Sequence, residues 1–236
     1  DADKARLEAF GAEQGLTLFL QPGGLDSVRP LAGEPPQLAF RLPQWDIELL
    51  FRPLDFIQVN ATLNQAMIAR ALELLDVQPG ERVLDLFCGL GNFTLPLARA
   101  SGDGAVVGVE GDAGLVARAR ANAAHNGMAN VQFHAADLAQ DLAGQPWLKA
   151  GSSTGTYDKL LLDPARSGAI EVLKQLPLKG LKRIVYVSCH PGSLARDAGY
   201  LVNEAGWTLR EAGVMDMFPH TAHVESIAVF DPPKKG

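Results

Sequence analysis

The sequence contains little cysteine and no long hydrophobic run. Its 236 residues include two cysteines, Cys88 and Cys189, too few for a disulfide framework, and no Cys-x-x-Cys pair for a zinc or iron–sulfur site. The apolar stretches near residues 160–162 and 184–187 are far shorter than the ~18 residues that read as a membrane span. No secretory leader opens the chain. We therefore expect a cytoplasmic protein with reduced thiols, no metal site and no membrane contact.

An overall basic charge is also missing. The 21 Lys and Arg against 27 Asp and Glu give a net charge of −6, which argues against a self-sufficient nucleic-acid binder. The charge is uneven, however, because residues 1–55 and 56–158 each carry −4 whereas residues 159–236 carry +2. The basic residues of this last part include Arg166, Lys182, Arg183, Arg196, Lys234 and Lys235. A modest basic surface is expected there, with a simple solvated face as the alternative.

The chain divides into two regions that differ in their predicted secondary structure. Its 47% hydrophobic residues are enough to bury a sizeable core. Residues 1–55 are rich in proline and contain short β-like runs at 16–20, 37–42 and 46–51. They predict a small β-rich appendage, which we interpret as the remnant of a central domain. Residues 56–236 form the second domain, in which strand and helix patterns alternate.

The second domain predicts a doubly wound, Rossmann-like α/β sheet. Continuous Val, Leu and Ile runs bounded by Gly, Asp or Pro are typical of parallel strands covered on both faces. Such runs occur at residues 82–87, 105–109, 131–134, 159–162 and 183–188. Helical patterns occur at residues 64–75, 114–125 and 193–205. Two last runs, 208–215 and 225–230, leave no room for a long helix between them, so they predict an antiparallel hairpin at the sheet edge.

The first strand of this domain leads into a glycine-rich turn and then a helix. Gly89 and Gly91 let the backbone approach a ligand at the carboxyl end of the strand. Thr94 stands where a dinucleotide-binding motif has its third glycine. Asp85, inside the strand end, would repel a phosphate but suits a cationic or ribose-bearing ligand. This combination favours S-adenosylmethionine, which has a sulfonium and no phosphate, over a dinucleotide.

Acidic residues follow the next two strands. Glu110 lies 19 residues beyond Gly91, close to the ~20 expected for a carboxylate that binds ribose hydroxyls. Asp137 follows the third strand, where it could accept a hydrogen bond from an adenine amino group. Each acid alone could equally be a helix cap or a solvated turn residue. Together with Asp85 and the glycine-rich loop, they indicate a methyltransferase-type nucleotide site.

The fourth and fifth strands end in a carboxylate and a thiol. Asp163 opens an Asp-Pro-Ala-Arg segment, and Cys189 lies in Val-Ser-Cys-His-Pro. A lone cysteine is often an apolar filler, but the following helix start could favour its thiolate form. Glu225 begins the last strand-like run and could simply flank it. His220 and His223 have no third ligand at a suitable spacing, so we predict no metal site.

These motifs occur together and in order, and the chain resembles the RNA 5-methyluridine methyltransferases. The motifs are Phe-Ile-Gln-Val-Asn at 56–60, the loop at 85–93, Asp-Pro-Ala-Arg at 163–166, Val-Ser-Cys-His-Pro at 187–191 and His-Val-Glu-Ser at 223–226. Asp-Pro-Ala-Arg and the segment at 215–221 resemble most the branch that acts on 23S ribosomal RNA. The resemblance covers residues 50–232, and residues 1–49 match only loosely.

The resemblance implies a reaction and a set of residues. It implies S-adenosylmethionine-dependent C5-methylation of a uridine, because a thiolate that adds to C6 makes C5 nucleophilic. Cys189 matches that nucleophile, and Glu225 matches the base that removes the C5 proton. The positions that match the cofactor pocket are Gln58, Phe87, Asn92, Glu110, Asp137 and Asp163. Asp163 is also expected near the uracil, and the residue types require no metal.

Two departures from the family pattern concern RNA binding. Such ribosomal-RNA enzymes often carry a four-cysteine iron–sulfur cluster and an N-terminal β-barrel, and neither is present here. We therefore expect a monomeric catalytic-domain fragment that binds ribosomal RNA weakly and in a salt-sensitive way. Three alternatives remain open: a tRNA or other ribosomal uridine as the target, a non-catalytic nucleotide- or RNA-binding module, and a methyltransferase for small molecules or proteins.

Overall fold

The computed structural model describes residues 2–149 and 157–233, so that Lys234 and Lys235 of the basic group lie outside it. The chain divides into two compact units, Asp1–Phe40 with Leu50–Asp55, and Arg41–Leu49 with Phe56–Gly236. No helix in the described part of the chain is both long and apolar enough to cross a membrane.

The smaller unit contains a helix that the sequence analysis did not predict. This helix, α1 (Ala2–Gln14), is followed by two-residue strands β1 (Phe19–Leu20) and β2 (Arg29–Pro30), which pair antiparallel. A 3-10 turn, Leu25–Ser27, lies between the two strands. The next two strands, β3 (Leu38–Leu42) and β4 (Ile47–Phe51), pair with each other around a second 3-10 turn, Pro43–Trp45, and the tip of this hairpin, Arg41–Leu49, belongs to the larger unit. The small two-stranded sheets confirm the β-rich character of this region, to which α1 is an addition.

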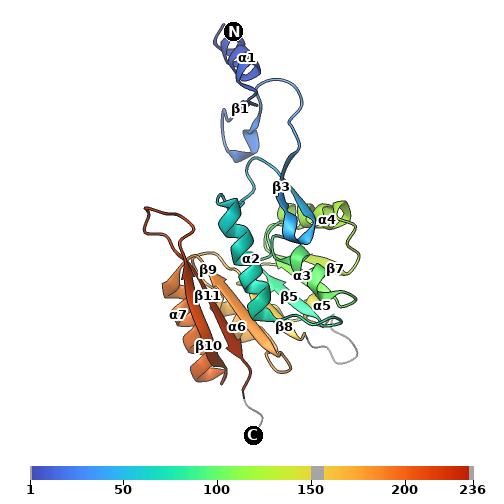
Figure 1. Cartoon of the computed structure of the whole chain (residues 1–236), viewed down its shortest axis with the longest axis vertical. Coiled ribbons are helices and arrows are strands. Elements are labelled where there is room, and N and C mark those ends of the chain that lie inside the picture. The colour runs from blue at the N-terminus through green and yellow to red at the C-terminus, as the bar shows by residue number, and fades with distance from the viewer. Residues whose placement is uncertain (1, 150–156, 234–236) are drawn as a thin grey trace. The chain divides into compact units, whose positions relative to one another are not determined.

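The larger unit contains a seven-stranded sheet with helices on both faces (Figure 1). Its strands are β5 (Val83–Leu86), β6 (Val106–Glu110), β7 (Val131–Ala135), β8 (Lys159–Leu162), β9 (Arg183–Ser188), β10 (Thr208–Met215) and β11 (Glu225–Asp231). Its helices are α2 (Ala61–Leu75), α3 (Thr94–Ser101), α4 (Ala113–His125), α5 (Pro146–Lys149), α6 (Ile170–Gln175) and α7 (Pro191–Gly199). The strand order is β10-β11-β9-β8-β5-β6-β7.

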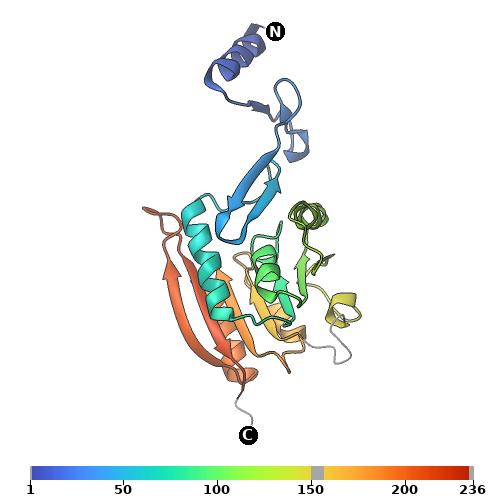
Figure 2. The ribbon, with the colours of Figure 1, turned by 45° about the vertical axis from the view of Figure 1, so that its right-hand side comes forward.

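The predicted doubly wound sheet with a terminal hairpin is confirmed. Strands β5 to β9 run parallel, and β11 pairs antiparallel with both β9 and β10 (Figure 2). Alternate strand residues point to opposite faces. On one face, buried side chains such as Leu86, Leu162 and Tyr186 pack with Leu173 of α6 and Leu194 of α7. This packing holds the strand ends, and the loops that follow them, in fixed relative positions.

One predicted helix is interrupted. The sequence pattern predicts a helix over 193–205, but α7 ends at Gly199 and a π-helical turn, Tyr200–Glu204, follows. The N–H of Ala205 donates to the carbonyl of Tyr200, five residues back. In this arrangement Leu201 is fully buried and Trp207, at 3% exposure, enters the core.

Candidate active site

The topology gathers the predicted site residues at one edge of the sheet. Parallel strands β5, β6, β7, β8 and β9 end at this edge, and the antiparallel strand β11 begins there. The residues brought to the edge are Phe87, Glu110, Asp137, Asp163, Cys189 and Glu225. In doubly wound folds this edge is where ligands bind.

The glycine-rich loop after β5 leaves space for a ligand. Gly89 and Gly91 have positive φ angles of 54° and 103°, and a Cβ on Gly89 would have nothing within 4 Å. Phe87 also has a positive φ of 64°, a strained conformation for a non-glycine residue. Glu110 holds the loop from β6, because its carboxylate accepts hydrogen bonds from the N–H groups of Gly89 and Asp112, both at 3.1 Å.

Two buried side-chain oxygens, one of them beside this loop, have no partner among the described residues. Asp85 is fully buried; Thr94 Oγ1 donates to its Oδ2 at 2.5 Å, but Oδ1 has no hydrogen-bond partner. Burial raises the pKa of Asp85 to about 8, and the charges of Asp163 and Glu110 add to the effect. The Oε1 atom of Gln58 is also buried without a partner. These oxygens suit a ligand that carries a positive charge and hydrogen-bond donors, as S-adenosylmethionine does.

Asn92 faces helix α2. Its side-chain amide and that of Asn64 donate to each other, each at 3.0 Å. Asn64 is 2% exposed and was not predicted as part of the site. The signal was an asparagine on the otherwise apolar buried face of α2. The pair fixes the glycine-rich loop to α2, and through it to the segment that carries Gln58.

Asp137 lies two residues beyond the end of β7 and is exposed. Its Oδ1 accepts a hydrogen bond from the N–H of Ala139 at 3.0 Å. The turn-residue alternative therefore describes its contacts here, and its assignment to adenine remains a prediction.

The thiol and the carboxylate come from adjacent strand ends. Ser226 pairs with Ser188, and Ser226 Oγ donates to the Ser188 carbonyl at 3.0 Å. Beyond this pair, the next residues are Glu225 and Cys189, so these two side chains start from neighbouring positions. Glu225 is 4% exposed, and Cys189 is half-buried.

The electrostatics correct one expectation about the thiol. The helix start after Cys189 predicts a favoured thiolate, yet the pKa of Cys189 is raised. Burial is the main cause, and the charges of Glu225 and Asp163 contribute, while Arg166 acts in the opposite direction. Burial also raises the pKa of Glu225, and burial together with Glu225 raises the pKa of Asp163 to about 7. The site thus disfavours the simultaneous ionisation of all three groups.

A second contact joins the loops on either side of this group. Arg166 Nη2 donates to Nδ1 of His223 at 2.8 Å, and Phe218 lies edge-on to the same ring. Because arginine only donates, His223 carries its proton on Nε2 in this contact. No group of three or more metal-ligating side chains occurs among the described residues.

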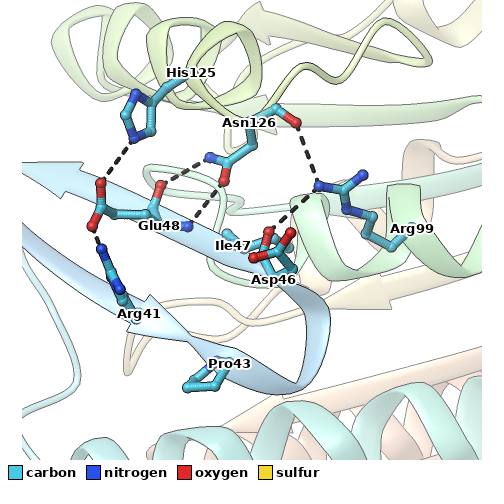
Figure 3. Close-up of a pocket in the computed structure, with 8 residues that line it drawn as sticks. All are labelled: Arg41, Pro43, Asp46, Ile47, Glu48, Arg99, His125 and Asn126. Atoms are coloured by element: carbon cyan, nitrogen blue, oxygen red, sulfur yellow. Dashed lines mark hydrogen bonds and ion pairs between the residues drawn. The ribbon is translucent and has the colours of Figure 1, made fainter.

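A separate polar cavity of about 520 Å³ lies between the β3–β4 hairpin tip and the ends of α3 and α4 (Figure 3). The carboxylate of Glu48 contacts two basic side chains of this cavity, Arg41 Nε at 2.9 Å and His125 Nε2 at 3.0 Å. The guanidinium of Arg99 reaches the carbonyls of Asp46 and Asn126, both at 3.4 Å. The cations of this cavity are thus neutralised or satisfied within the protein, and none of the predicted site residues lines it.

A sheet of this order, with acidic residues at successive strand ends beside a glycine-rich loop, has the fold of the S-adenosylmethionine-dependent methyltransferases. Two solved structures share it. The structure of M. jannaschii TYW2 in complex with AdoMet has a TM-score of 0.63 and 17% identity, covering 92% of this chain and 93% of that one. The P. horikoshii TYW2 in complex with MeSAdo has a TM-score of 0.66 and 15% identity, covering 97% and 82%.

The family follows from sequence comparison. The family model for tRNA (uracil-5-)-methyltransferases matches residues 41–231. The 23S rRNA (uracil(1939)-C(5))-methyltransferase RlmD of Stenotrophomonas maltophilia is 69% identical over 98% of this chain. The RlmD of Xanthomonas axonopodis pv. citri is 68% identical over the same share. The chain belongs to the tRNA (uracil-5-)-methyltransferase family, and the predicted resemblance to its 23S ribosomal-RNA branch is confirmed. It spans about 50% of the length of these relatives.

Proposed function

We propose that this chain is the catalytic part of an enzyme that methylates C5 of a uridine in 23S ribosomal RNA, with S-adenosylmethionine as methyl donor. The observation that carries the proposal is the placement of Cys189 and Glu225 at adjacent strand ends, beside Asp163 and the cofactor-type loop. Relatives that are 69% and 68% identical are named for this reaction at uracil 1939, which favours the same target here.

The methyl donor fits the residues at the glycine-rich loop. Its ammonium and sulfonium charges suit the unpartnered Asp85 oxygen, and its donors suit Gln58 Oε1. The other residues that we assign to this pocket are Phe87, Asn92, Glu110, Asp137 and Asp163. When bound, the cofactor supplies an electrophilic methyl group to carbon. The role of the chain is to hold it against the uracil and to exclude water.

The thiolate of Cys189 forms a bond to C6 of the uracil, and the electrons of the C5–C6 double bond move toward C5 and the C4 carbonyl. S-adenosylmethionine, held by the residues assigned to its pocket, would supply the methyl group that this nucleophilic C5 receives. The carboxylate of Glu225 accepts the C5 proton, and the C–H electrons restore the double bond. This expels the Cys189 thiolate and completes the cycle without a redox change.

The residues outside the site bear on substrate binding. The +2 charge of residues 159–236 supports weak, salt-sensitive contact with RNA. Most of the affinity of the relatives for RNA would then come from the half of their length that this chain does not span. We propose that residues 1–55 are the remnant of a central domain that precedes the methyltransferase domain, residues 56–236. We also propose a monomer that acts in the cytoplasm, where ribosomal RNA is found.

The test is tritium release from ribosomal RNA that carries [5-³H]uridine, with and without S-adenosylmethionine. Release that depends on the methyl donor supports the proposal, and both Cys189→Ser and Glu225→Gln should abolish it. Glu225→Gln should in addition retain RNA on a denaturing gel, because the methylated adduct cannot lose its proton. Donor-dependent methylation at another atom, without tritium release, would overturn the proposal. Transfer RNA, assayed in parallel, tests the alternative substrate.

A further inference from the structure

Helix α7 carries a buried carboxylate that the proposed reaction does not use. Asp197 is 0% exposed. Its Oδ2 accepts hydrogen bonds from Tyr186 Oη and from the N–H of Ala169, both at 2.6 Å. Its Oδ1 accepts from Arg196 Nε at 2.8 Å. A buried charge is tolerated only when it is fully paired in this way, so these contacts hold their donors firmly in place.

The donors come from the segments that support the active site. Tyr186 lies in β9, three residues before Cys189. Ala169 ends the loop that begins with Asp163, after β8. The bond to Asp197 raises the pKa of Tyr186 further than burial alone does, so Tyr186 stays a donor. One carboxylate therefore connects the two strand ends from which Asp163 and Cys189 emerge.

The loop approaches this carboxylate too closely for any residue but glycine. Gly168 has a φ of +81°, and a Cβ there would lie 2.6 Å from Asp197 Oδ2 and 2.5 Å from Arg196 Nη2. The same Arg196 nitrogen donates to the carbonyl of Ser167 at 2.7 Å. The 163–169 loop is thus fixed by three consecutive residues, Ser167, Gly168 and Ala169.

The far end of this loop acts on the thiol. The charge of Asp163 raises the pKa of Cys189, and the charge of Arg166 lowers it. Arg166 also contacts His223, two residues before Glu225. A displacement of the loop would therefore change the surroundings of both the nucleophile and the base, although Asp197 itself touches neither.

We propose that Asp197 is a positioning residue that holds the 163–169 loop, through Ala169 and Arg196, so that Asp163 and Arg166 stand beside Cys189. The inference rests on the proposed function for its meaning in catalysis. The positioning itself is a property of the free protein and can be measured on the Cys189 thiol alone.

Glu81 provides a matched control at the opposite edge of the sheet. It is 7% exposed and paired with Lys182 at 2.8 Å and Lys159 at 3.6 Å, so it is a buried ionic group of the same kind. Its partners lie at the start of β8 and before β9, away from the strand ends that carry the site. Glu81→Gln should cost stability without reaching Cys189.

The experiment compares the wild-type chain with Asp197→Asn, Arg196→Lys and Glu81→Gln. Arg196→Lys keeps the positive charge but removes the guanidinium group that donates both to Asp197 and to the carbonyl of Ser167. Because Arg196 is partly exposed, this variant replaces Asp197→Asn in the experiment if Asp197→Asn does not fold. The first readout is alkylation of Cys189 by iodoacetamide as a function of pH, followed by peptide mass. The second is the rate of covalent adduct formation with a short RNA that contains 5-fluorouridine, at saturating S-adenosylmethionine.

We expect Asp197→Asn and Arg196→Lys to lower the alkylation midpoint toward the ordinary 9.0, because a displaced loop takes Asp163 away from the thiol, and Asp163 affects the pKa of Cys189 more than Arg166 does. We expect adduct formation to slow about 10- to 100-fold, since small misplacements in an active site have such effects. Glu81→Gln should change neither. Midpoints and rates equal to those of Glu81→Gln would overturn the positioning role. An absence of adduct from the wild-type chain extended to the full length of its relatives would count against the proposed function instead, and the alkylation result would still decide the role of Asp197.

Discussion

Replacing Asp85 by asparagine should make the protein more stable at alkaline pH and less able to bind its cofactor. Asp85 is fully buried with one unpartnered oxygen, and its pKa is raised from an ordinary 3.8 to about 8. Asparagine has the same shape and can still accept the Thr94 hydrogen bond, but it cannot ionise. The variant therefore removes the free-energy cost of burying an ionisable carboxyl group, which the wild-type protein retains at its cofactor site.

The sign follows from proton binding in the two states. Between about pH 4 and pH 8 the unfolded chain has released the Asp85 proton, whereas the folded chain retains it, so wild-type stability falls as pH rises through this window. A difference of about four pH units, at about 1.4 kcal/mol each, sets the loss at no more than about 6 kcal/mol. Above about pH 8 both states are ionised and the loss stops increasing.

The assay is urea unfolding of wild type and Asp85→Asn at a series of pH values from about 5 to 9. The stability advantage of the variant should grow with pH and level off above about 8. Asp158→Asn is a control of opposite sign: burial raises the pKa of Asp158, but the Arg82 N–H and Lys182 outweigh it, so the pKa is lowered and this variant should lose stability at neutral pH. An Asp85→Asn advantage that is independent of pH would refute the reasoning, as would undiminished S-adenosylmethionine binding in calorimetry.

Three further predictions concern packing, nucleophile and substrate. Gly108→Ala should cost about 1–3 kcal/mol in unfolding free energy, because its Cβ would lie 2.7 Å from Phe133 and 3.0 Å from Cys88 Sγ; a thermal melt that is unchanged would contradict this packing. Adduct formation with 5-fluorouridine RNA should accelerate as pH rises above about 8, because the pKa of Cys189 is raised above 9.0 and its thiolate is scarce at lower pH. A rate that is already constant below neutral pH would contradict this, since it would mean that the pKa of Cys189 is lowered when RNA is bound. RNA binding by this chain, measured by filter retention, should weaken steeply with salt; tight binding that ignores salt would speak against a phosphate-dominated contact.

Most of the fold was accessible from local sequence patterns. The strands β5, β6, β8 and β9 are continuous apolar runs ending at Gly, Asp or Ser, and the short spacing between β10 and β11 demands a hairpin. Helix α1 shows no apolar face from which a helix could be predicted, because Gly11 is its single buried residue. The π-helical turn after α7 was missed because its cause is tertiary: the burial of Leu201 and Trp207.

The position of a site residue was predictable where it lies at the end of a strand. It was less predictable where the role of the residue depends on tertiary contacts. Cys189 could be placed at the carboxyl end of its strand from the pattern, whereas Glu225 followed from the resemblance alone, and their electrostatic coupling depends on the β9–β11 register. The raised pKa of Cys189 could not be foreseen, because burial and two acids outweigh the helix start. Asn64 and Asp197 act through partners 28 residues away in sequence, Asn92 and Ala169, and no local pattern reveals such pairs.

The central claim is that Cys189 forms a covalent bond to a uracil during methyl transfer. The direct measurement is a denaturing gel of the protein after incubation with 5-fluorouridine-substituted 23S ribosomal RNA and S-adenosylmethionine, in which fluorine at C5 prevents release. We expect a slowly migrating protein–RNA complex for the wild-type chain and none for Cys189→Ser. A complex that persists in Cys189→Ser, or its absence from the protein extended to the full length of its relatives, would contradict the account.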